Sequence, residues 1–498
     1  MNILFATTEA TPFCKTGGLG DVCGALPVEL SRRGQNCTVI MPAFRQALRA
    51  GLDIRPTDLW FQAPVGSKMV GAEVLESRLP ESDVPVYLIK QDQYYDRPEL
   101  YRDEAGDYRD NCERFVFFAR AVLETIRLLD LQTNVLHCHD WQAGLLPAYL
   151  RTLYAVRPPF DQIATLFTIH NLAYQGVFWH WDMELTGIGW EHFNYQQLEF
   201  YGKLNFMKSG LTMADVLSTV SPRYAEEIQE PPMSCGMEGV LAHRADELFG
   251  VLNGVDYDDW NPATDAYLAA NYGPSDWHEG KAVCKAALQH EMGLPANPET
   301  PLLASVGRLA DQKGFDLIAD VLPRYARDRD AQWVLLGTGE PKYHELLSAL
   351  AAEFPGRVAV ELGFSNELAH RIEAGADMFL MPSRYEPCGL NQMYSLKYGT
   401  PPIVRETGGL ADTITGANDH TLASGEANGF SFADASPYAL SMAIDRALEA
   451  YRDPAVWTKI VDTGMRQDWS WGRSADRYIE LYEHTHAAAM ARKAAVVL

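Results

Sequence analysis

Short apolar runs alternate with longer helix-like segments along almost the whole chain, and this alternation restricts the possible folds more than any other feature. The helix-like segments include residues 115–129 and 439–451. Strands that alternate with helices form parallel sheets with helices on both faces, so the sequence predicts an α/β protein. The predicted strands are residues 3–7, 37–41, 84–89, 135–138, 164–169, 216–220, 302–306, 333–336, 358–362, 378–381 and 402–404.

One break divides these strands into two sets of similar size. It is the turn-forming stretch Asn253-Gly254-Val255-Asp256, with a proline at position 262. We therefore predict two doubly wound, Rossmann-like lobes that face each other across a cleft, with residues 1–255 in the first and 256–474 in the second. The alanine-rich segment 475–498 is predicted to be helical and could pack on either lobe, including back on the first.

The charge balance restricts the possible partners. The 42 Lys and Arg against 66 Asp and Glu give 42 − 66 = −24. This acidity argues against a broad basic surface that binds nucleic acid or an anionic membrane. The sequence contains no run of 18 or more apolar residues, which a transmembrane helix would need. An anionic ligand would have to be bound by a few well-placed groups.

The eight cysteines indicate the cellular compartment of the protein rather than a metal or redox site. None of them shows the C-x-x-C spacing of a zinc ribbon or a redox dithiol, and they are too sparse for a disulfide scaffold. We interpret them as reduced thiols. The chain runs from Met1 directly into a strand-like segment without the pattern of a signal peptide, so we expect a cytoplasmic protein.

A glycine-rich loop follows the first predicted strand. It reads Lys15-Thr16-Gly17-Gly18-Leu19-Gly20-Asp21 and leads into an amphipathic segment. Glycines let the backbone approach a phosphate, and a helix N-terminus offers unpaired N–H groups to an anion. The loop matches neither the P-loop nor G-x-G-x-x-G, so a nicotinamide site is poorly supported. The alternative is a tight turn with a solvated lysine.

The second half has two comparable loops. Arg308 and Lys313 follow a strand and could both reach a diphosphate at the carboxyl edge of the sheet. Glu386 follows another strand, and Gly389-Leu390 opens a predicted helix whose N–H groups could meet phosphate oxygens. The alternatives are solvated surface cations and a Glu386 that serves only as a helix-capping acid.

Polar residues also follow two strands of the first half. The stretches are His137-Cys138-His139-Asp140-Trp141 and His170-Asn171. A metal site is poorly supported, since no second ligand pair is evident, whereas Trp can stack on sugar rings and Asp, His and Asn can bind hydroxyls. Buried structural histidines are the alternative. A D-x-D pattern at Asp256 and Asp258 is discounted, because it lies in the connection between the lobes.

Taken together, these motifs closely resemble those of the bacterial glycogen synthases, which are related to the plant starch synthases. The resemblance runs from residue 1 to about residue 482. The motifs are KTGGLGD at 15–21, HCHDW at 137–141, HNLAYQG at 170–176, NGVD at 253–256, GRLADQKG at 307–314, SRYEPCGL at 383–390 and TGGLAD at 407–412.

The resemblance implies a GT-B fold and an enzyme that transfers glucose, with retention, from ADP-glucose to the non-reducing end of an α-1,4-glucan. It implies no metal and no other cofactor. The implied catalytic residues are Glu386, His170, Asp140, Arg308 and Lys313. The implied donor-binding residues are Lys15, Gly17, Gly18, Asn253, Arg308, Lys313, Phe364, Cys388, Gly389 and Leu390, with Phe364 placed against adenine.

Two departures from the family pattern matter. Asn391 replaces a common threonine, and Tyr394 stands where sucrose-synthase-like transferases have a second glutamate. The tyrosine favours the glycogen and starch synthases. The main alternative is a related GT-B enzyme that uses UDP-glucose or a small acceptor. An inactive glucan-binding scaffold would be expected to lack Lys15, Arg308, Lys313 or Glu386, and a dehydrogenase would need a dinucleotide motif. The oligomeric state cannot be predicted.

Overall fold

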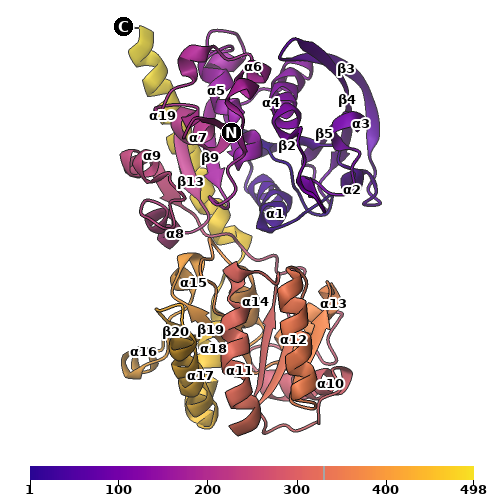
Figure 1. Ribbon diagram of the computed structural model, residues 1–498, viewed down its shortest axis with the longest axis vertical. Coiled ribbons are helices and arrows are strands. Elements are labelled where there is room, and N and C mark those ends of the chain that lie inside the picture. Colours follow the sequence, from indigo (N-terminus) through magenta and orange to yellow (C-terminus); the bar gives the residue numbers. More distant parts are fainter. Residues whose placement is uncertain (329–330, 498) are drawn as a thin grey trace. The chain divides into compact units, whose positions relative to one another are not determined.

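The computed structural model describes residues 1–328 and 331–497. The chain divides into two compact units (Figure 1). Unit 1 consists of Met1–Gly254 together with the C-terminal segment from Trp471, and unit 2 is Val255–Ser470. The first unit therefore ends one residue before the predicted boundary at 255. The second ends at Ser470 rather than at 474, because the last helix already begins at Trp471.

Unit 1 is built on one sheet of nine strands in the order β14-β13-β9-β8-β1-β2-β5-β4-β3. The strands from β14 to β5 are parallel, whereas β4 pairs antiparallel with both β5 and β3. Their bounds are β1 Asn2–Ala6, β2 Asn36–Pro42, β3 Arg55–Val65, β4 Lys68–Arg78, β5 Pro85–Lys90, β8 Val135–His139, β9 Ala164–Ile169, β13 Val216–Thr219 and β14 Leu248–Gly250.

Ten α-helices and two small sheets complete the described part of unit 1. The helices are α1 Gly18–Arg32, α2 Arg45–Leu48, α3 Asp92–Tyr95, α4 Asn111–Leu128, α5 Leu145–Arg151, α6 Met183–Thr186, α7 Phe206–Met213, α8 Pro222–Glu227, α9 Glu238–His243 and α19 Trp471–Val497. The small sheets pair β6 Arg102–Asp103 with β7 Gly106–Asp107, and β12 Lys203–Asn205 with both β10 Val177–Phe178 and β11 Glu199–Phe200.

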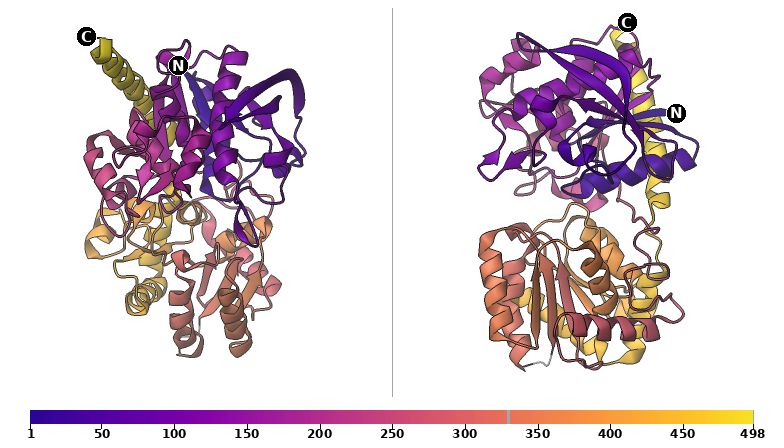
Figure 2. Two further views of the ribbon diagram at one scale, coloured as in Figure 1. Left: turned by 45° about the horizontal axis from the view of Figure 1, so that its top comes forward. Right: turned by 90° about the vertical axis from the view of Figure 1, so that its right-hand side faces the viewer.

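Unit 2 has a six-stranded parallel sheet in the order β17-β16-β15-β18-β19-β20, covered by helices on both faces (Figure 2). The strands are β15 Leu302–Val306, β16 Gln332–Gly337, β17 Val358–Leu362, β18 Met378–Met381, β19 Pro402–Arg405 and β20 Phe430–Phe432. The helices are α10 Trp277–Glu291, α11 Phe315–Asp328, α12 Pro341–Glu353, α13 Asn366–Gly375, α14 Asn391–Lys397, α15 Gly408–Thr413, α16 Asp419–Ser424, α17 Pro437–Tyr451 and α18 Pro454–Arg466.

All the strands predicted from continuous apolar runs are present. All of these runs except β17 lie inside the sheets rather than at an edge, and β8, β9 and β13 are buried along their whole length. The hairpin of β3 and β4 was not predicted, because its residues alternate between the core and solvent. In β3, for example, Phe61 is buried and Trp60 is exposed. The edge strands β14 and β20 were also missed, since each has three residues.

The C-terminal helix α19 packs on unit 1, along α1 and β9 (Figure 2). Tyr482 of this helix lies within hydrogen-bond distance of His137 in β8, with 2.9 Å between the hydroxyl and Nδ1. Arg492 forms an ion pair with the buried Asp215 at 2.8 Å. Of the two placements that the sequence left open for segment 475–498, the structure has the one on unit 1.

Two further findings concern the helices and the cysteines. None of the helices in residues 1–328 and 331–497 combines the length and the apolar character that crossing a bilayer requires. No disulfide joins any of the eight cysteines, all of which lie in the described part of the chain, and seven of them are buried.

Candidate active site

The carboxyl ends of β8 and β9 bring two of the predicted site residues together in unit 1. Asp140 follows β8 directly, and His170 follows β9, its neighbour in the sheet. The backbone N–H of His170 donates a hydrogen bond of 2.8 Å to Oδ1 of Asp140. Parallel strands expose their carboxyl ends at one edge, which is where ligands of such sheets bind.

Asp140 is held in an unfavourable state. Its backbone has φ 54°, a conformation that non-glycine residues rarely adopt and that costs of order 1–3 kcal/mol. Burial removes water from its carboxyl group and raises the pKa from 3.8 to about 7. Strain and a raised carboxyl pKa in one residue at a sheet edge are typical of a functional position.

The raised pKa of Asp140 leads to a prediction on stability. Between pH 4 and pH 7 the folded state keeps a proton on Asp140 that the unfolded state, with its pKa near 3.8, has lost. The free energy of unfolding that this group contributes must therefore fall as the pH rises through that window. Asp140→Asn keeps an acceptor for His170 and cannot ionise. We therefore compare the unfolding temperature of the variant with that of the natural protein. The difference, variant minus natural protein, should be more positive at pH 8 than at pH 5.

Thermal unfolding of both proteins at the two pH values measures this difference. The exposed Asp107, changed to asparagine, is the matched control and should give the same difference at both pH values. A difference for Asp140→Asn that does not change with pH would contradict the account of its environment.

His170 and two further histidines, His139 and His137, form a buried chain. Nδ1 of His139 lies 2.9 Å from Nε2 of His170, and the rings of His137 and His139 are 3.9 Å apart. Nε2 of His137 lies 2.6 Å from Oγ1 of Thr168. Burial lowers all three pKa values, that of His170 to about 3, so the imidazoles are neutral at pH 7. The chain therefore orients His170 without adding charge.

In the described ranges, no group of three or more His, Cys, Asp or Glu side chains is placed to hold a metal ion. The first aspartate of the D-x-D pattern has a local structural role, since Oδ1 of Asp256 accepts a hydrogen bond of 3.0 Å from the backbone N–H of Asp258.

The glycine-rich loop leads into α1, which begins at Gly18. Nζ of Lys15 forms an ion pair of 2.8 Å with Asp21 in the first turn of this helix. The backbone N–H groups of Thr16 and Gly17 donate to the carboxylate of Glu9, at 2.5 and 3.3 Å. The binding of phosphate by Lys15, Gly17 and Gly18 stays a prediction, and it would require the amide of Gly17 to leave Glu9.

Glu9 was missed by the sequence reasoning. It is only 3% exposed, and burial raises its pKa. Its Oε1 accepts a hydrogen bond of 2.8 Å from the hydroxyl of Tyr101, which also contacts Thr8 at 2.7 Å. The only signal in the sequence is an acid shortly after a buried strand, and that signal does not show that the glycine loop folds back over it.

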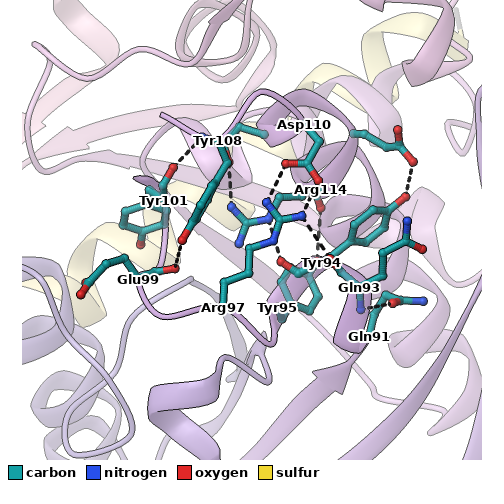
Figure 3. Close-up of polar contacts among 12 residues, drawn as sticks. Gln91, Gln93, Tyr94, Tyr95, Arg97, Glu99, Tyr101, Tyr108, Asp110 and Arg114 are labelled. Carbon is teal, nitrogen blue, oxygen red and sulfur yellow. Dashed lines mark hydrogen bonds and ion pairs between the residues drawn. The ribbon is translucent and has the colours of Figure 1, made fainter. Parts of the chain in front are cut away.

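Tyr101 is carried by a long loop that a buried arginine holds in place (Figure 3). Arg114 of α4 is completely buried, and its guanidinium donates to the carbonyl oxygens of Tyr94 and Leu100 at 2.8 and 2.9 Å. It also donates to Oδ1 of Asn111 at 2.7 Å. Arg97 adds an ion pair with Asp110. These contacts connect α4 to the loop whose tyrosine reaches Glu9.

Two predicted site residues of unit 2 form an ion pair. Nζ of Lys313 lies 2.6 Å from Oε2 of Glu386, which also accepts a hydrogen bond of 3.0 Å from the hydroxyl of Ser383. Glu386 is 6% exposed. The alternative of a helix-capping acid is wrong, because the residue at the N-cap of α14 is Leu390. The carboxylate of Glu386 instead faces the lysine.

Glycines let the loops of this site pack closely. Gly314 has φ +71°, and a Cβ there would lie 2.2 Å from the carbonyl oxygen of Pro382, so the loop of Lys313 lies directly against the one that leads to Glu386. At Gly408, in the TGGLAD motif, a Cβ would lie 2.0 Å from the carbonyl oxygen of Glu386. The sequence reasoning gave this second glycine loop no role, although it packs against the site.

The remaining predicted residues of unit 2 and the two positions that depart from the family pattern have different surroundings. Arg308 is exposed and donates to Oε1 of Gln312 at 2.9 Å. Phe364 follows β17 and is 82% exposed, as an aromatic group for stacking would be. The side chain of Asn391 donates to the carbonyl oxygen of Val306 at 3.0 Å, which ties α14 to the end of β15. Tyr394 stacks on Trp260 at 3.9 Å.

The residues just before α14 lie where a helix N-terminus opens. Cys388 is buried, Gly389 has φ +71° and Leu390 is the N-cap, so the helix begins at Asn391 rather than at Gly389 as predicted. Asn253 lies at the end of unit 1 and is 5% exposed. Donor binding by these four residues stays a prediction.

Comparison with known proteins identifies the family. Residues 2–243 match the family described as starch synthase catalytic domain, and residues 290–461 match glycosyl transferases group 1. A glycogen synthase of Rhodopirellula baltica is 49% identical over 97% of this chain and 98% of its own length. The chain belongs to the glycogen synthase family. A glycogen synthase of Anaeromyxobacter sp. is 45% identical, over 97% of this chain and 99% of the relative.

The solved structures agree with this family. The catalytic domain of starch synthase IV from Arabidopsis thaliana, bound to ADP and acarbose, superposes with a TM-score of 0.88 at 31% identity, over 98% of this chain and 99% of that one. A sucrose-phosphate synthase from Thermosynechococcus elongatus, at 17% identity and a TM-score of 0.59, shares the fold. The GT-B fold and the glycosyltransferase class predicted from the sequence are confirmed.

Proposed function

We propose that this protein is an ADP-glucose-dependent glycogen synthase that adds glucose to the non-reducing end of an α-1,4-glucan. The observation that carries the proposal is the Lys313–Glu386 pair at 2.6 Å, in a chain whose relatives over nearly its full length are glycogen synthases. The ADP in the related starch synthase supports the choice of the donor.

In the proposed reaction, the bond between the anomeric carbon and the β-phosphate oxygen breaks with oxocarbenium character. Lys313 and Arg308 stabilise the negative charge that develops on the leaving diphosphate, and the N–H groups that precede α14 contribute in the same way. Such electrostatic stabilisation is often the largest single contribution to catalysis. Glu386 would bind glucose hydroxyls and the developing positive charge. Asp140 and His170 of unit 1 are also suited to bind sugar hydroxyls.

Retention would follow from attack on the face from which the diphosphate leaves. The acceptor hydroxyl forms its bond to the anomeric carbon, and a phosphate oxygen of the departing ADP takes its proton. Of the carboxylates in the predicted site, Glu386 is the one that we consider as a covalent nucleophile, and its contact with Lys313 favours a role in binding and charge stabilisation. Isolation of a glucosyl-Glu386 adduct would contradict this mechanism.

We expect the reaction to need no metal ion, because Lys313 and Arg308 already supply positive charge for the diphosphate. Activity should therefore be unchanged when the enzyme is assayed in excess EDTA after dialysis against a chelator. A loss of activity that magnesium or manganese restores would show that the donor is bound as a metal complex.

We also propose that the protein acts in the cytoplasm and binds neither nucleic acid nor membranes. Eight cysteines without a disulfide suit a reducing compartment, and the net charge of −24 suits a neutral polysaccharide better than an anionic polymer.

One assay separates this function from its main alternative, a related transferase that uses UDP-glucose or a small acceptor. Radiolabelled ADP-glucose and UDP-glucose are offered in parallel with glycogen, with maltose and without a primer. We expect label in glycogen from ADP-glucose at a much higher kcat/KM than from UDP-glucose. A preference for UDP-glucose, or incorporation only into maltose, would favour the alternative.

A further inference from the structure

Unit 1 carries an unusual exposed group of aromatic side chains in the segments before and after α6. Helix α6 is labelled in Figure 1. Trp179, Trp181 and Trp190 are 62%, 50% and 43% exposed. The ring centroids of Trp179 and Trp181 lie 6.4 Å apart, and those of Trp181 and Trp190 lie 5.4 Å apart. His180 and Phe193 flank the three tryptophans. We call these five residues the aromatic surface.

The three tryptophans of the aromatic surface are unusually exposed for their residue type. Tryptophan is usually buried for most of its area, and a group of exposed large apolar side chains commonly marks an interaction site. The rings meet at interplanar angles of 67° and 74°, so their faces point in different directions instead of forming one flat apolar patch. Such an arrangement suits a ligand with several separate apolar faces.

The charges within the chain segment that carries the rings restrict what the ligand can be. No lysine or arginine occurs between Arg157 and Lys203, whereas Asp182, Glu184 and Glu191 lie among the tryptophans. An anionic membrane or a nucleic acid would be repelled there. A neutral polyhydroxyl chain is complementary to both features, because its C–H faces stack on aromatic rings and its hydroxyls donate to carboxylates.

The aromatic surface is also continuous with the candidate active site in the chain. The segment starts at His170 and reaches Trp179 through β10. Phe178 of β10 packs on Trp141 of the HCHDW motif, with ring centroids 5.9 Å apart, and on Phe206 of α7 at 4.8 Å. Trp179 therefore directly follows a half-buried residue that packs on the HCHDW motif.

We propose that the aromatic surface is a binding site for an α-1,4-glucan chain, separate from the site of glucosyl transfer. The choice of glucan as the ligand rests on the proposed function. A polymer bound at this surface keeps further chain ends at a high effective concentration near the enzyme, whereas a short acceptor gains nothing from it. The surface should therefore matter for glycogen and not for a short oligosaccharide.

The test uses the double variant Trp179→Ala/Trp181→Ala of the full chain, with glycogen and maltotriose as acceptors. Glycogen affinity is measured by the retardation of the protein in gels that contain glycogen. Truncation of a well-placed aromatic residue commonly costs about tenfold or more in affinity. We expect at least that loss for glycogen and a similar rise in its KM. The kcat and the KM for maltotriose should be unchanged.

Two controls separate binding from folding. Trp60 in β3 of the same unit is 59% exposed, and Trp60→Ala should leave glycogen retardation unchanged. Trp179→Tyr/Trp181→Tyr keeps aromatic faces and should restore most of the affinity that the alanine variant loses. A tyrosine variant as weak as the alanine variant would overturn the proposal, as would equal losses for maltotriose and glycogen.

Other outcomes also decide the question. Normal glycogen retardation of the alanine double variant would overturn the proposal. The oligomeric state of the double variant, measured by analytical ultracentrifugation, is also decisive. If the variant is a smaller oligomer than the natural protein and this change explains its weaker binding, the tryptophans cover a second copy of the chain and the proposal is overturned. Failure of the natural protein to transfer glucose to maltotriose would count against the proposed function alone, because retardation in glycogen gels does not depend on turnover.

Discussion

Lys313→Ala should lower kcat by about 10²–10³, with a much smaller change in the KM for ADP-glucose. The lysine lies 2.6 Å from a buried carboxylate at the carboxyl edge of the unit 2 sheet. Its charge is needed most when the diphosphate departs, so its removal should raise the barrier of the chemical step. Steady-state kinetics with varied ADP-glucose at saturating glycogen measures both parameters.

Lys342→Ala is the matched control for this variant. Lys342 also forms an ion pair with a carboxylate of unit 2, that of Asp311 at 2.6 Å, but it is exposed. An exposed pair contributes little, and we expect both kinetic parameters to stay within about twofold of those of the natural enzyme. A Lys313→Ala enzyme with a normal kcat and a raised KM would show that the lysine only binds the donor.

Arg114→Met should destabilise unit 1 by about 3–5 kcal/mol. The substitution leaves three buried acceptors without their donor, namely the carbonyl oxygens of Tyr94 and Leu100 and Oδ1 of Asn111. Burial already lowers the pKa of Arg114 to about 10, so the charged side chain is costly to bury and is retained for these contacts (Figure 3). Hydrogen exchange should become faster first in the loop that Arg114 holds, residues 94–110.

Loss of this loop should also affect catalysis, because it carries Tyr101, which donates to Glu9 beside the glycine loop. Arg109→Met is the control, since Arg109 is an exposed arginine of the same loop and should leave exchange and activity unchanged. Exchange that accelerates equally throughout unit 1 in Arg114→Met would contradict a local role for the arginine.

The sequence was most informative where residues are buried on both faces of a sheet. A continuous apolar run such as 164–169 predicts a strand whatever surrounds it, whereas the hairpin of β3 and β4 shows the alternation of a half-exposed surface and was overlooked. Contacts between distant positions were harder to predict. The positions of Lys313 and Glu386 at strand ends could be read from the sequence, but their direct contact depends on Gly314, which lets two loops meet.

Glu9 shows most clearly which site residues the sequence alone does not reveal. An acid after a first strand is unremarkable in a chain with 66 acidic residues, and its importance depends on Thr16, Gly17 and Tyr101, which reach it only in the folded protein. The buried histidine chain is similar, because His139 was placed near the site but its alignment with His170 depends on the register of β8 and β9.

Analysis of the product formed from labelled ADP-glucose and glycogen tests the central claim most directly. After a single round of incorporation, the product is digested with an exo-acting hydrolase that removes only α-1,4-linked units from non-reducing ends. The account predicts that the label is released completely and at the start of the digestion. Label that resists the enzyme, or no label in glycogen at all, would contradict retaining transfer from ADP-glucose to the ends of an α-1,4-glucan.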